Sequence, residues 1–362
     1  MSAWPFVSVA IPMRNEAASI GALLASVLAQ DYPAEQLEIL VVDGDSDDES
    51  AAAVERVAAR DARVRLLHNP QRIVPSALNI AIRAARGTVI ARVDGHTRLA
   101  PDYLRVGVET LVRSGADNVG GRMDAVGGGW FGDAVADATA SPAGVGSYFH
   151  FGTEEREVDT VYLGMWPRAV FERVGLFDEE LVRNQDDEFN YRLRKLGGRI
   201  VLNPAMRSWY QNRQDVVHLV RQYYQYGQWK VRVLQKHPAQ MSWRHFVPPA
   251  FVAGMALLAV VGPEWAPAAW ALRAVGSLYL LLVLAAALRQ SARRGATGVL
   301  ATALALSCVH VAWGAGFLSG LIKFADRWRK PEQGPPRLEP TGEAIASAMA
   351  PWGGAPGGRE GA

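Results

Sequence analysis

The chain contains a single cysteine, Cys308, which lies in an apolar run. One cysteine excludes an internal disulfide framework and a cysteine-based metal site. Neither sign of charge is in excess, because 38 Lys and Arg residues oppose 36 Asp and Glu residues, for a formal net charge of +2. Without a basic excess or a basic cluster, the composition does not indicate a nucleic-acid-binding protein.

Two familiar N-terminal signals are also absent. Residues 1–5 lack the basic start and apolar core of a signal peptide. The first predicted strand, residues 6–11, leads into Pro12–Glu16 and not into a glycine-rich turn. A nicotinamide or flavin enzyme of the Rossmann type is therefore disfavoured.

Charged residues almost disappear between positions 246 and 322, where three apolar runs cover residues 246–262, 267–288 and 298–322. A helix needs about 20 apolar residues to cross a bilayer. The second and third runs meet this length, whereas the first is short, has two prolines near its start, and could be re-entrant. We therefore expect a membrane domain at 246–322, with two to three apolar segments.

The positive-inside rule leaves the topology of these runs open. The arginines at 289–294 favour the cytoplasmic side, which fits a hairpin formed by the first two runs. Three full crossings would place Lys323 and the basic residues after it outside, against the rule. Either the third run turns back or the first does not span. Because no signal precedes the soluble part, we expect a multi-pass protein of the cell membrane with its catalytic domain in the cytoplasm.

Residues 1–214 alternate predicted strands and helices, which is typical of an α/β domain with a parallel, doubly wound sheet. The expected strands are 6–11, 37–42, 64–67 and 88–91, and the expected helices include 51–59, 75–85 and 101–113. Residues 215–245 contain a helix that mixes aromatic and basic side chains, as interfacial helices do. An ordinary amphipathic helix packed on the domain has the same pattern. The proline- and glycine-rich tail, 331–362, is predicted to be disordered.

Polar residues gather where these strands end, at Pro12–Glu16, Asp43–Asp48 and Asp94–His96, and again at Gln185–Glu188. Ligands bind at this edge of open α/β sheets. The Asp94 carboxylate and the His96 imidazole are suitable ligands for a divalent cation, which could in turn hold a diphosphate. An Asp-Gly turn without function explains Asp94-Gly95 equally well. Capping of a helix N-terminus would likewise explain part of the acidic run 186–188.

Together these clusters resemble the family 2 glycosyltransferases of the GT-A fold. The resemblance rests on Val-Ser-Val-Ala-Ile-Pro-Met-Arg-Asn-Glu, on Val-Val-Asp-Gly-Asp-Ser-Asp-Asp, on Val-Asp-Gly-His at the Asp-x-Asp position, and on Gln-Asp-Asp-Glu-Phe-Asn. These motifs occur in the family's order over about the first 215 residues. The most similar subgroup is the succinoglycan type of membrane-anchored bacterial exopolysaccharide glycosyltransferases.

The resemblance implies a donor site for a nucleotide sugar. Asp43 is expected to contact the nucleotide base, and Asp94 the ribose and diphosphate. Asp94 and His96 would bind Mg²⁺ or Mn²⁺, although histidine replaces the family's second acid. The expected nucleotide-sugar-binding residues are Pro12, Asn15, Glu16, Asp43, Asp45 and Asp94.

On the acceptor side, Asp186 matches the acid that acts as general base, and Asp187 is its rival. Gln185 replaces the usual glutamate. Gln225 and Trp229 match the frame of a Gln-x-x-Arg-Trp motif that processive synthases carry, but Gln228 stands at the arginine position. An amide does not replace the charged fork of arginine.

These features predict an inverting, metal-dependent transfer of a hexose from a UDP-sugar or another nucleotide sugar. The predicted acceptor is a polyprenyl-diphosphate-linked saccharide at the membrane, in exopolysaccharide or cell-surface glycan biosynthesis. A processive polysaccharide synthase subunit is one alternative. A catalytically silent membrane scaffold with the same fold is another.

Overall fold

The computed structural model describes residues 4–144, 147–329 and 334–338. The chain divides into two compact units. The first, called the sheet unit here, comprises residues 1–124, 152–210 and 334–362. The second, the helical unit, comprises residues 125–151 and 211–333.

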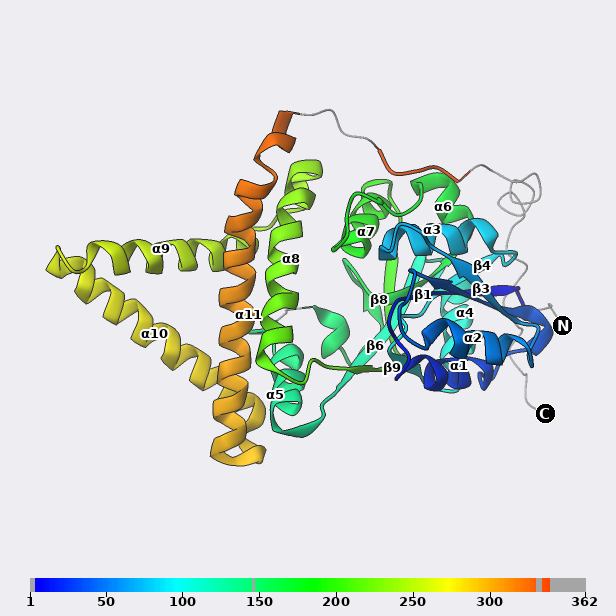
Figure 1. The fold of residues 1–362 in the computed structure, drawn as a ribbon, viewed down its shortest axis with the longest axis horizontal. Helices are drawn as coiled ribbons and strands as arrows, with labels where there is room; N and C mark the ends of the chain where they lie inside the picture. The colour runs from blue at the N-terminus through cyan, green and yellow to red at the C-terminus, as the bar shows by residue number, and fades with distance from the viewer. Residues whose placement is uncertain (1–3, 145–146, 330–333, 339–362) are drawn as a thin grey trace, which may run out of the picture. The chain divides into compact units, whose positions relative to one another are not determined.

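The sheet unit is built on one mixed β-sheet (Figure 1). Its strands lie in the order β3-β2-β1-β4-β8-β6-β9-β5, and β7 pairs with β9. Their bounds are β1 (Val7–Met13), β2 (Leu37–Asp43), β3 (Val64–His68), β4 (Val89–Arg92), β5 (Thr97–Leu99), β6 (Asn118–Val126), β7 (Arg156–Glu157), β8 (Tyr162–Pro167) and β9 (Ile200–Gln211).

Strands β1 to β4 confirm the predicted parallel arrangement, since β1 pairs in parallel with β2 and β4, and β2 with β3. The prediction of a parallel sheet is wrong for the strands on the other side of β4. Strand β8 pairs antiparallel with β4 and β6, and β5 pairs antiparallel with β9. Strand β5 follows β4 after only four intervening residues, too few for the crossover that would place it parallel beside β4, and it pairs with β9 instead.

Helices cover both faces of this sheet (Figure 1). Side chains that alternate along β1 and β2, such as Val9, Ile11 and Ile39, share a core with Leu23 and Leu24 of the first helix. The other face of these two strands packs against α3. The helices are α1 (Ile20–Leu28), α2 (Ser50–Ala58), α3 (Val74–Ala84), α4 (Tyr103–Ser114), α6 (Ala169–Val174) and α7 (Gln185–Lys195).

The helical unit contains α5 (Gly129–Ala140), α8 (Val216–Lys236), α9 (Val247–Val261), α10 (Ala266–Ser291) and α11 (Gly295–Lys323). Helices α8 and α11 touch through their backbones. A Cβ atom added at Gly316 would lie 2.0 Å from the Tyr224 carbonyl oxygen, and one added at Gly320 would lie 2.5 Å from that of Gln228. Since residue numbers rise together on both helices, α8 and α11 run in the same direction.

Helices α9 and α10 form a hairpin whose base packs on α11. Near the start of α9, the Pro248 carbonyl oxygen would lie 2.6 Å from a Cβ atom at Gly314, and near the end of α10, Ala287 shares an apolar cluster with Val299. The two helices meet at their other ends, away from α11 (Figure 1). The stretches Trp243–Val261 and Ala266–Lys323 are long and apolar enough to cross a membrane.

The predicted disordered tail, 331–362, lies outside the described residues except for 334–338. In that short segment the Pro336 carbonyl oxygen accepts a hydrogen bond of 2.8 Å from the Leu176 backbone N–H.

Candidate active site

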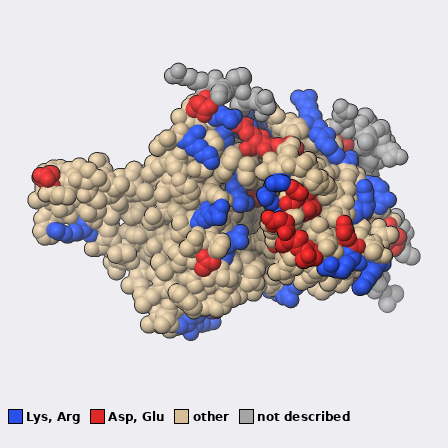
Figure 2. All heavy atoms as spheres, viewed as in Figure 1, with Lys and Arg blue, Asp and Glu red and all other residues tan. Residues whose placement is uncertain are grey.

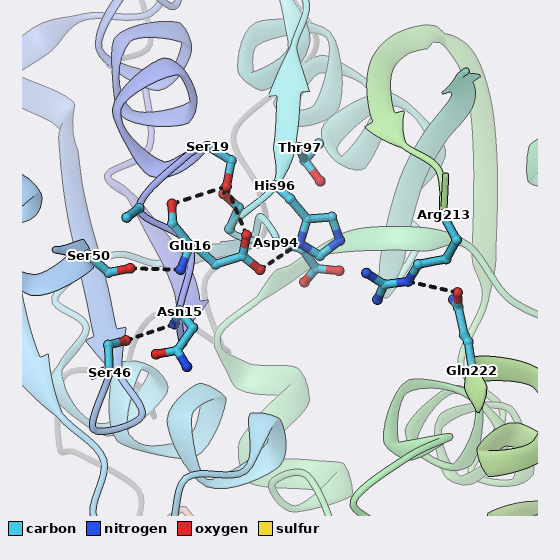
Figure 3. Close-up of polar contacts among 12 residues, drawn as sticks. Asn15, Glu16, Ser19, Ser46, Ser50, Asp94, His96, Thr97, Arg213 and Gln222 are labelled. Carbon is cyan, nitrogen blue, oxygen red and sulfur yellow. Dashed lines mark hydrogen bonds and ion pairs between the residues drawn. The ribbon is translucent and has the colours of Figure 1, made fainter. Parts of the chain in front are cut away.

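The polar residues that follow β1, β2 and β4 meet at one edge of the sheet. Met13 at the end of β1 pairs with Asp43 at the end of β2, and Ala10 of β1 pairs with Arg92 at the end of β4. Parallel strands direct their carboxyl ends to the same edge. The structure thus brings Asn15, Glu16, Asp94 and His96 into one region (Figure 3). Asp43 joins them through Ser46, which hydrogen bonds to both Asp43 and Asn15.

The loops after β1 and β2 are joined by hydrogen bonds (Figure 3). The Asn15 backbone N–H donates to Ser46 Oγ at 2.9 Å, and Asn15 Oδ1 accepts from the Asp47 N–H at 3.1 Å. Asn15 and Asp45 adopt left-handed backbone conformations with φ of 55° and 59°. Asn and Asp tolerate this region better than other side chains with a Cβ atom. The two loops therefore form one preorganised surface.

Asp43 and Asp45 differ in exposure. Asp43 is buried and accepts hydrogen bonds from the hydroxyl and backbone N–H of Ser46, at 2.5 and 3.2 Å. Asp45 is half-exposed and forms an ion pair with Arg72. The Asp43 carboxylate is consequently held in one orientation, while the Asp45 side chain is more exposed to solvent.

Arg92 lies between two of the predicted carboxylates. Its Nε donates to Asp94 Oδ1 at 2.7 Å and its Nη2 to Asp94 Oδ2 at 3.2 Å. Its Nη1 lies 3.8 Å from Asp186 Oδ2. The Arg92 side chain is 8% exposed and that of Asp186 is 47% exposed. One buried guanidinium therefore contacts an acid that follows β4 and an acid on α7.

Burial and charge act in opposite directions on this arginine. Burial alone would lower the pKa of Arg92, but the Asp94 and Asp186 carboxylates raise it above its ordinary value. The neighbouring Tyr162 hydroxyl also has a raised pKa, because it is buried and lies near the negative charge of Asp94. Tyr162 therefore stays protonated, and its hydroxyl hydrogen bonds to Thr97 Oγ1 at 2.8 Å. The site holds a permanent positive charge beside a neutral phenol.

His96 is oriented by Glu16 (Figure 3). Its Nδ1 lies 3.0 Å from Glu16 Oε1, and Ser19 Oγ donates to Glu16 Oε2 at 2.8 Å. The imidazole packs edge-on against Tyr210, with ring centroids 4.9 Å apart. Nδ1 is thereby engaged, and Nε2 has no hydrogen-bond partner among the described residues.

The acidic run opens helix α7. Asp186 Oδ1 accepts the Asp187 backbone N–H at 2.9 Å, and Gln185 is buried. Glu188 is 1% exposed and pairs with Arg192, with Nε 2.5 Å from Oε1. Arg192 also donates to the carbonyl oxygens of Val174 and Leu176. Glu188 is therefore a structural residue, whereas Asp186 is open to solvent on one side.

Gln225 and Trp229 belong to α8 of the helical unit. Within the helical unit, the Trp229 ring packs on that of Phe324, with centroids 5.2 Å apart.

The sequence prediction gave no role to Arg92 or Tyr162. A signal for Arg92 was present, because an arginine in an otherwise apolar strand is a buried charge that requires a partner. Residues two apart in a strand lie on the same face, so Asp94 was its nearest candidate partner. Tyr162 could not have been found in this way, since it comes from β8, across the antiparallel half of the sheet.

Known proteins resemble this chain in sequence and in fold. Residues 8–175 match the family model described as glycosyl transferase family 2. The succinoglycan biosynthesis protein ExoA of Rhizobium meliloti is 32% identical over 329 residues, which cover 88% of this chain and 96% of that protein. A dolichyl N-acetyl-alpha-D-glucosaminyl phosphate 3-beta-D-2,3-diacetamido-2,3-dideoxy-beta-D-glucuronosyltransferase of Methanococcus voltae is 26% identical over 88% of this chain and 98% of its own length.

A similar fold occurs in the mannosyltransferase PcManGT from Pyrobaculum calidifontis, solved in complex with GDP-Man and Mn²⁺. That structure covers 89% of this chain and 88% of its own, with a TM-score of 0.62 and 21% sequence identity. The fold is therefore GT-A, as expected. From the extent of these matches, the chain belongs to glycosyltransferase family 2 and is a glycosyltransferase.

Proposed function

We propose that this enzyme transfers a hexose from a nucleotide sugar, a UDP-sugar, to a polyprenyl-diphosphate-linked saccharide, with inversion at the anomeric carbon. One observation carries the proposal: buried Arg92 contacts both Asp94, at the strand ends, and Asp186, on α7. An inverting transfer needs a leaving-group side and a base side at opposite faces of the sugar. Two carboxylates from separate elements on either side of one cation supply such a pair.

The donor side consists of the joined loops and Asp43. The fixed Asp43 carboxylate would accept hydrogen bonds from the nucleotide base, and the Pro12–Glu16 loop and Asp45 would form the walls of the nucleotide pocket. Because Asn15 and Asp45 already hold left-handed conformations and hydrogen bonds join the two loops, this surface needs little ordering when the donor binds.

The residues present fit a divalent cation at Asp94 and His96. Each Asp94 oxygen that accepts from Arg92 keeps a further lone pair. Glu16 engages Nδ1 of His96, as a carboxylate commonly does for a histidine that binds metal through its other nitrogen. The described residues contain no group of three or more His, Cys, Asp or Glu side chains placed to hold a metal. Diphosphate oxygens would complete the coordination, as is usual for Mg²⁺. Bound Mg²⁺ or Mn²⁺ would stabilise the charge on the departing nucleoside diphosphate.

Asp186 would take the proton from the acceptor hydroxyl as its oxygen attacks. It is open to solvent, it is not committed to a short ion pair, and Arg92 lies within electrostatic range. Asp187 remains the rival, and Glu188 is already paired with Arg192. Gln185 is buried and would position this end of α7.

The acceptor class is supported by the relatives and by the apolar helices. One relative is named for succinoglycan biosynthesis and another for transfer to a dolichyl-linked sugar. The apolar stretches in the helical unit would hold the enzyme at the membrane that contains such lipids. They are too few to enclose a polymer channel, which favours transfer of one sugar per encounter over processive synthesis.

A panel of radiolabelled nucleotide sugars, incubated with membranes that contain the protein, tests this function. We expect label from one sugar in the lipid extract, as a product one residue longer than the acceptor. Chelation by EDTA should stop incorporation, and added Mn²⁺ or Mg²⁺ should restore it. Incorporation that EDTA leaves unchanged would refute the metal assignment, and label in long polymer would favour the processive alternative.

We further propose that the α9–α10 hairpin enters the bilayer while α11 stays at its surface beside α8. Helix α8 carries Arg221, Lys230, Arg232 and Lys236, which makes a membrane crossing costly. Because α11 packs along α8 through backbone contacts and in the same direction, it follows the same path. Arg294 at the start of α11 pairs with Asp133 and Asp137 of α5, each at 2.8 Å.

The hairpin has the composition of a bilayer segment. Between Val247 and Leu288 the charged residues are Glu264 and Arg273, and the surface of the hairpin is largely uncharged in Figure 2. Helix α10 has 26 residues, or about 39 Å at 1.5 Å per residue, enough to cross the hydrocarbon core. Exposed Trp265 and Trp270 lie near the turn, where interfacial aromatic residues are typical. This arrangement places Arg293 and Lys323 on the same, cytoplasmic side.

Single-cysteine labelling tests the topology. In a Cys308→Ala background, Glu264→Cys should react with a membrane-impermeant maleimide in sealed right-side-out vesicles. Arg293→Cys and Ala325→Cys, near the two ends of α11, should react only after the vesicles are opened. If Ala325→Cys reacted from outside while Arg293→Cys did not, α11 would be a crossing helix and the proposal would be wrong.

A further inference from the structure

The last turn of α11 presents a lysine whose position is fixed by its neighbours. Lys323 is exposed, and its Nζ donates to Gln228 Oε1 at 2.9 Å. The Gln228 amide is oriented in turn, because its Nε2 donates to Ser319 Oγ at 3.1 Å. A lysine side chain on a surface normally samples many rotamers, and each fixed contact removes part of that freedom. Here the ammonium group is held at one place between α8 and α11.

Two aromatic rings complete its surroundings. Nζ lies 5.5 Å from the centroid of the Trp229 ring and 5.4 Å from that of Phe324. These rings attract a cation without neutralising it. No described carboxylate forms an ion pair with Lys323, and the only acidic residues between Gln211 and Arg329 are Asp215, Glu264 and Asp326. Arg294, near the other end of α11, differs from Lys323 in this respect, because it forms ion pairs with two aspartates.

Exposed apolar side chains adjoin the cationic end of α11: Ile322 is 80% exposed, Phe246 42% and Leu321 37%. Phe317 and Phe324 are buried beneath the surface. The rings of Trp313 and Phe317 stack with centroids 5.5 Å apart, and Phe246 packs edge-on against Phe317 at 5.9 Å. Phe317 and Phe324 belong to one apolar cluster with Val231. A ligand suited to this place has an anionic head and an apolar chain joined to it. A lysine ammonium is a common binding group for phosphate.

We propose that Lys323, aligned by Gln228 and Trp229, binds the phosphate-bearing head of the lipid-linked acceptor. This inference rests on the proposed function, since it identifies where that acceptor is held. Gln228 itself is uncharged, but Lys323 of α11 places an ammonium group 2.9 Å from its side-chain oxygen. Gln228 and Trp229 are positioning residues, and Lys323 is the binding residue.

Binding of a polyprenyl diphosphate to the full-length protein in phosphatidylcholine nanodiscs provides the test. Replacing Lys323 with Gln should weaken binding about tenfold, the usual scale for loss of one charge-assisted hydrogen bond. Lys323→Arg should retain most of the affinity. Arg293→Gln, which removes one exposed cation near the other end of α11, is the matched control and should bind as the wild type does. In turnover assays, Lys323→Gln should raise KM for the lipid acceptor and leave KM for the nucleotide sugar unchanged.

A second set of nanodiscs, with phosphatidylglycerol and no polyprenyl lipid, distinguishes an acceptor site from a contact with bulk anionic lipid. If Lys323→Gln weakened association with phosphatidylglycerol as strongly as with the polyprenyl diphosphate, the acceptor assignment would be overturned. Equal affinity of wild type and Lys323→Gln for the polyprenyl diphosphate would also overturn it. If instead the folded, nucleotide-binding wild type bound no polyprenyl diphosphate at all, the acceptor class in the proposed function would be the part that fails.

Discussion

Replacing Asp186 with Asn is expected to reduce sugar transfer by a factor of about 10²–10⁴, the usual contribution of a positioned general base. Asparagine has almost the same shape, and its oxygen can still accept the Asp187 backbone N–H that Asp186 Oδ1 accepts at 2.9 Å. The substitution therefore removes the proton acceptor and leaves the start of α7 in place. The nucleoside diphosphate should bind with unchanged affinity, which isothermal titration can measure.

Asp187→Asn is the matched control for this experiment, because it changes the adjacent acid in the same way. It should retain most of the transfer activity. Loss of activity in Asp187→Asn together with full activity in Asp186→Asn would reassign the base to Asp187. Glu188 offers a third comparison: its variants are expected to lower thermal stability, since it is 1% exposed and paired with Arg192.

Replacing Arg92 with Met should both destabilise the sheet unit and abolish donor binding. Removing one partner of a buried ion pair costs about 3–5 kcal/mol, because the remaining charge is left without compensation. Here the remaining charge is that of Asp94, whose side chain is 17% exposed. Arg92→Lys keeps the charge but cannot match both carboxylate oxygens, so it should have intermediate stability. Thermal unfolding and titration with UDP in the presence of Mn²⁺ measure the two effects.

A double variant separates stability from function. Arg92→Met combined with Asp94→Asn removes both charges, so much of the lost stability should return, whereas metal-dependent binding of UDP should not. If Arg92→Met unfolded at the wild-type temperature and bound UDP normally, the buried bridge would have no role in the site.

The parallel half of the fold was predictable largely because three of its four strands, β1, β2 and β4, are buried on both faces. Such strands appear in the sequence as continuous apolar runs, and the runs 37–42 and 88–91 became β2 and β4 with small changes at their ends. Strand β1 continued through Pro12 to Met13, although the proline had been expected to end it. The polar residues after these strands were correctly expected at one edge of the sheet, because parallel strand direction alone decides that.

Elements that depend on distant partners were not predictable in the same way. Helix α5 begins at Gly129, after two other glycines, and its Phe131 and Val135 acquire an apolar environment only by packing with α8 and α11. Strand β9 was missed, and it contains Pro204 and several polar residues. The bridge from Arg92 to Asp186 spans two elements nearly a hundred residues apart, so no local spacing could indicate it.

The proposed hairpin has a consequence for how substrate is found. A catalytic unit anchored by α9 and α10 encounters a lipid acceptor by diffusion in the plane of the bilayer, not in the volume of the cell. Confinement of two partners to one surface raises their effective concentration in the way a linker does. A head-group site that depends on a single lysine is then sufficient, since the acceptor need not be captured from solution. The quantity that controls turnover becomes the mole fraction of acceptor lipid in the membrane.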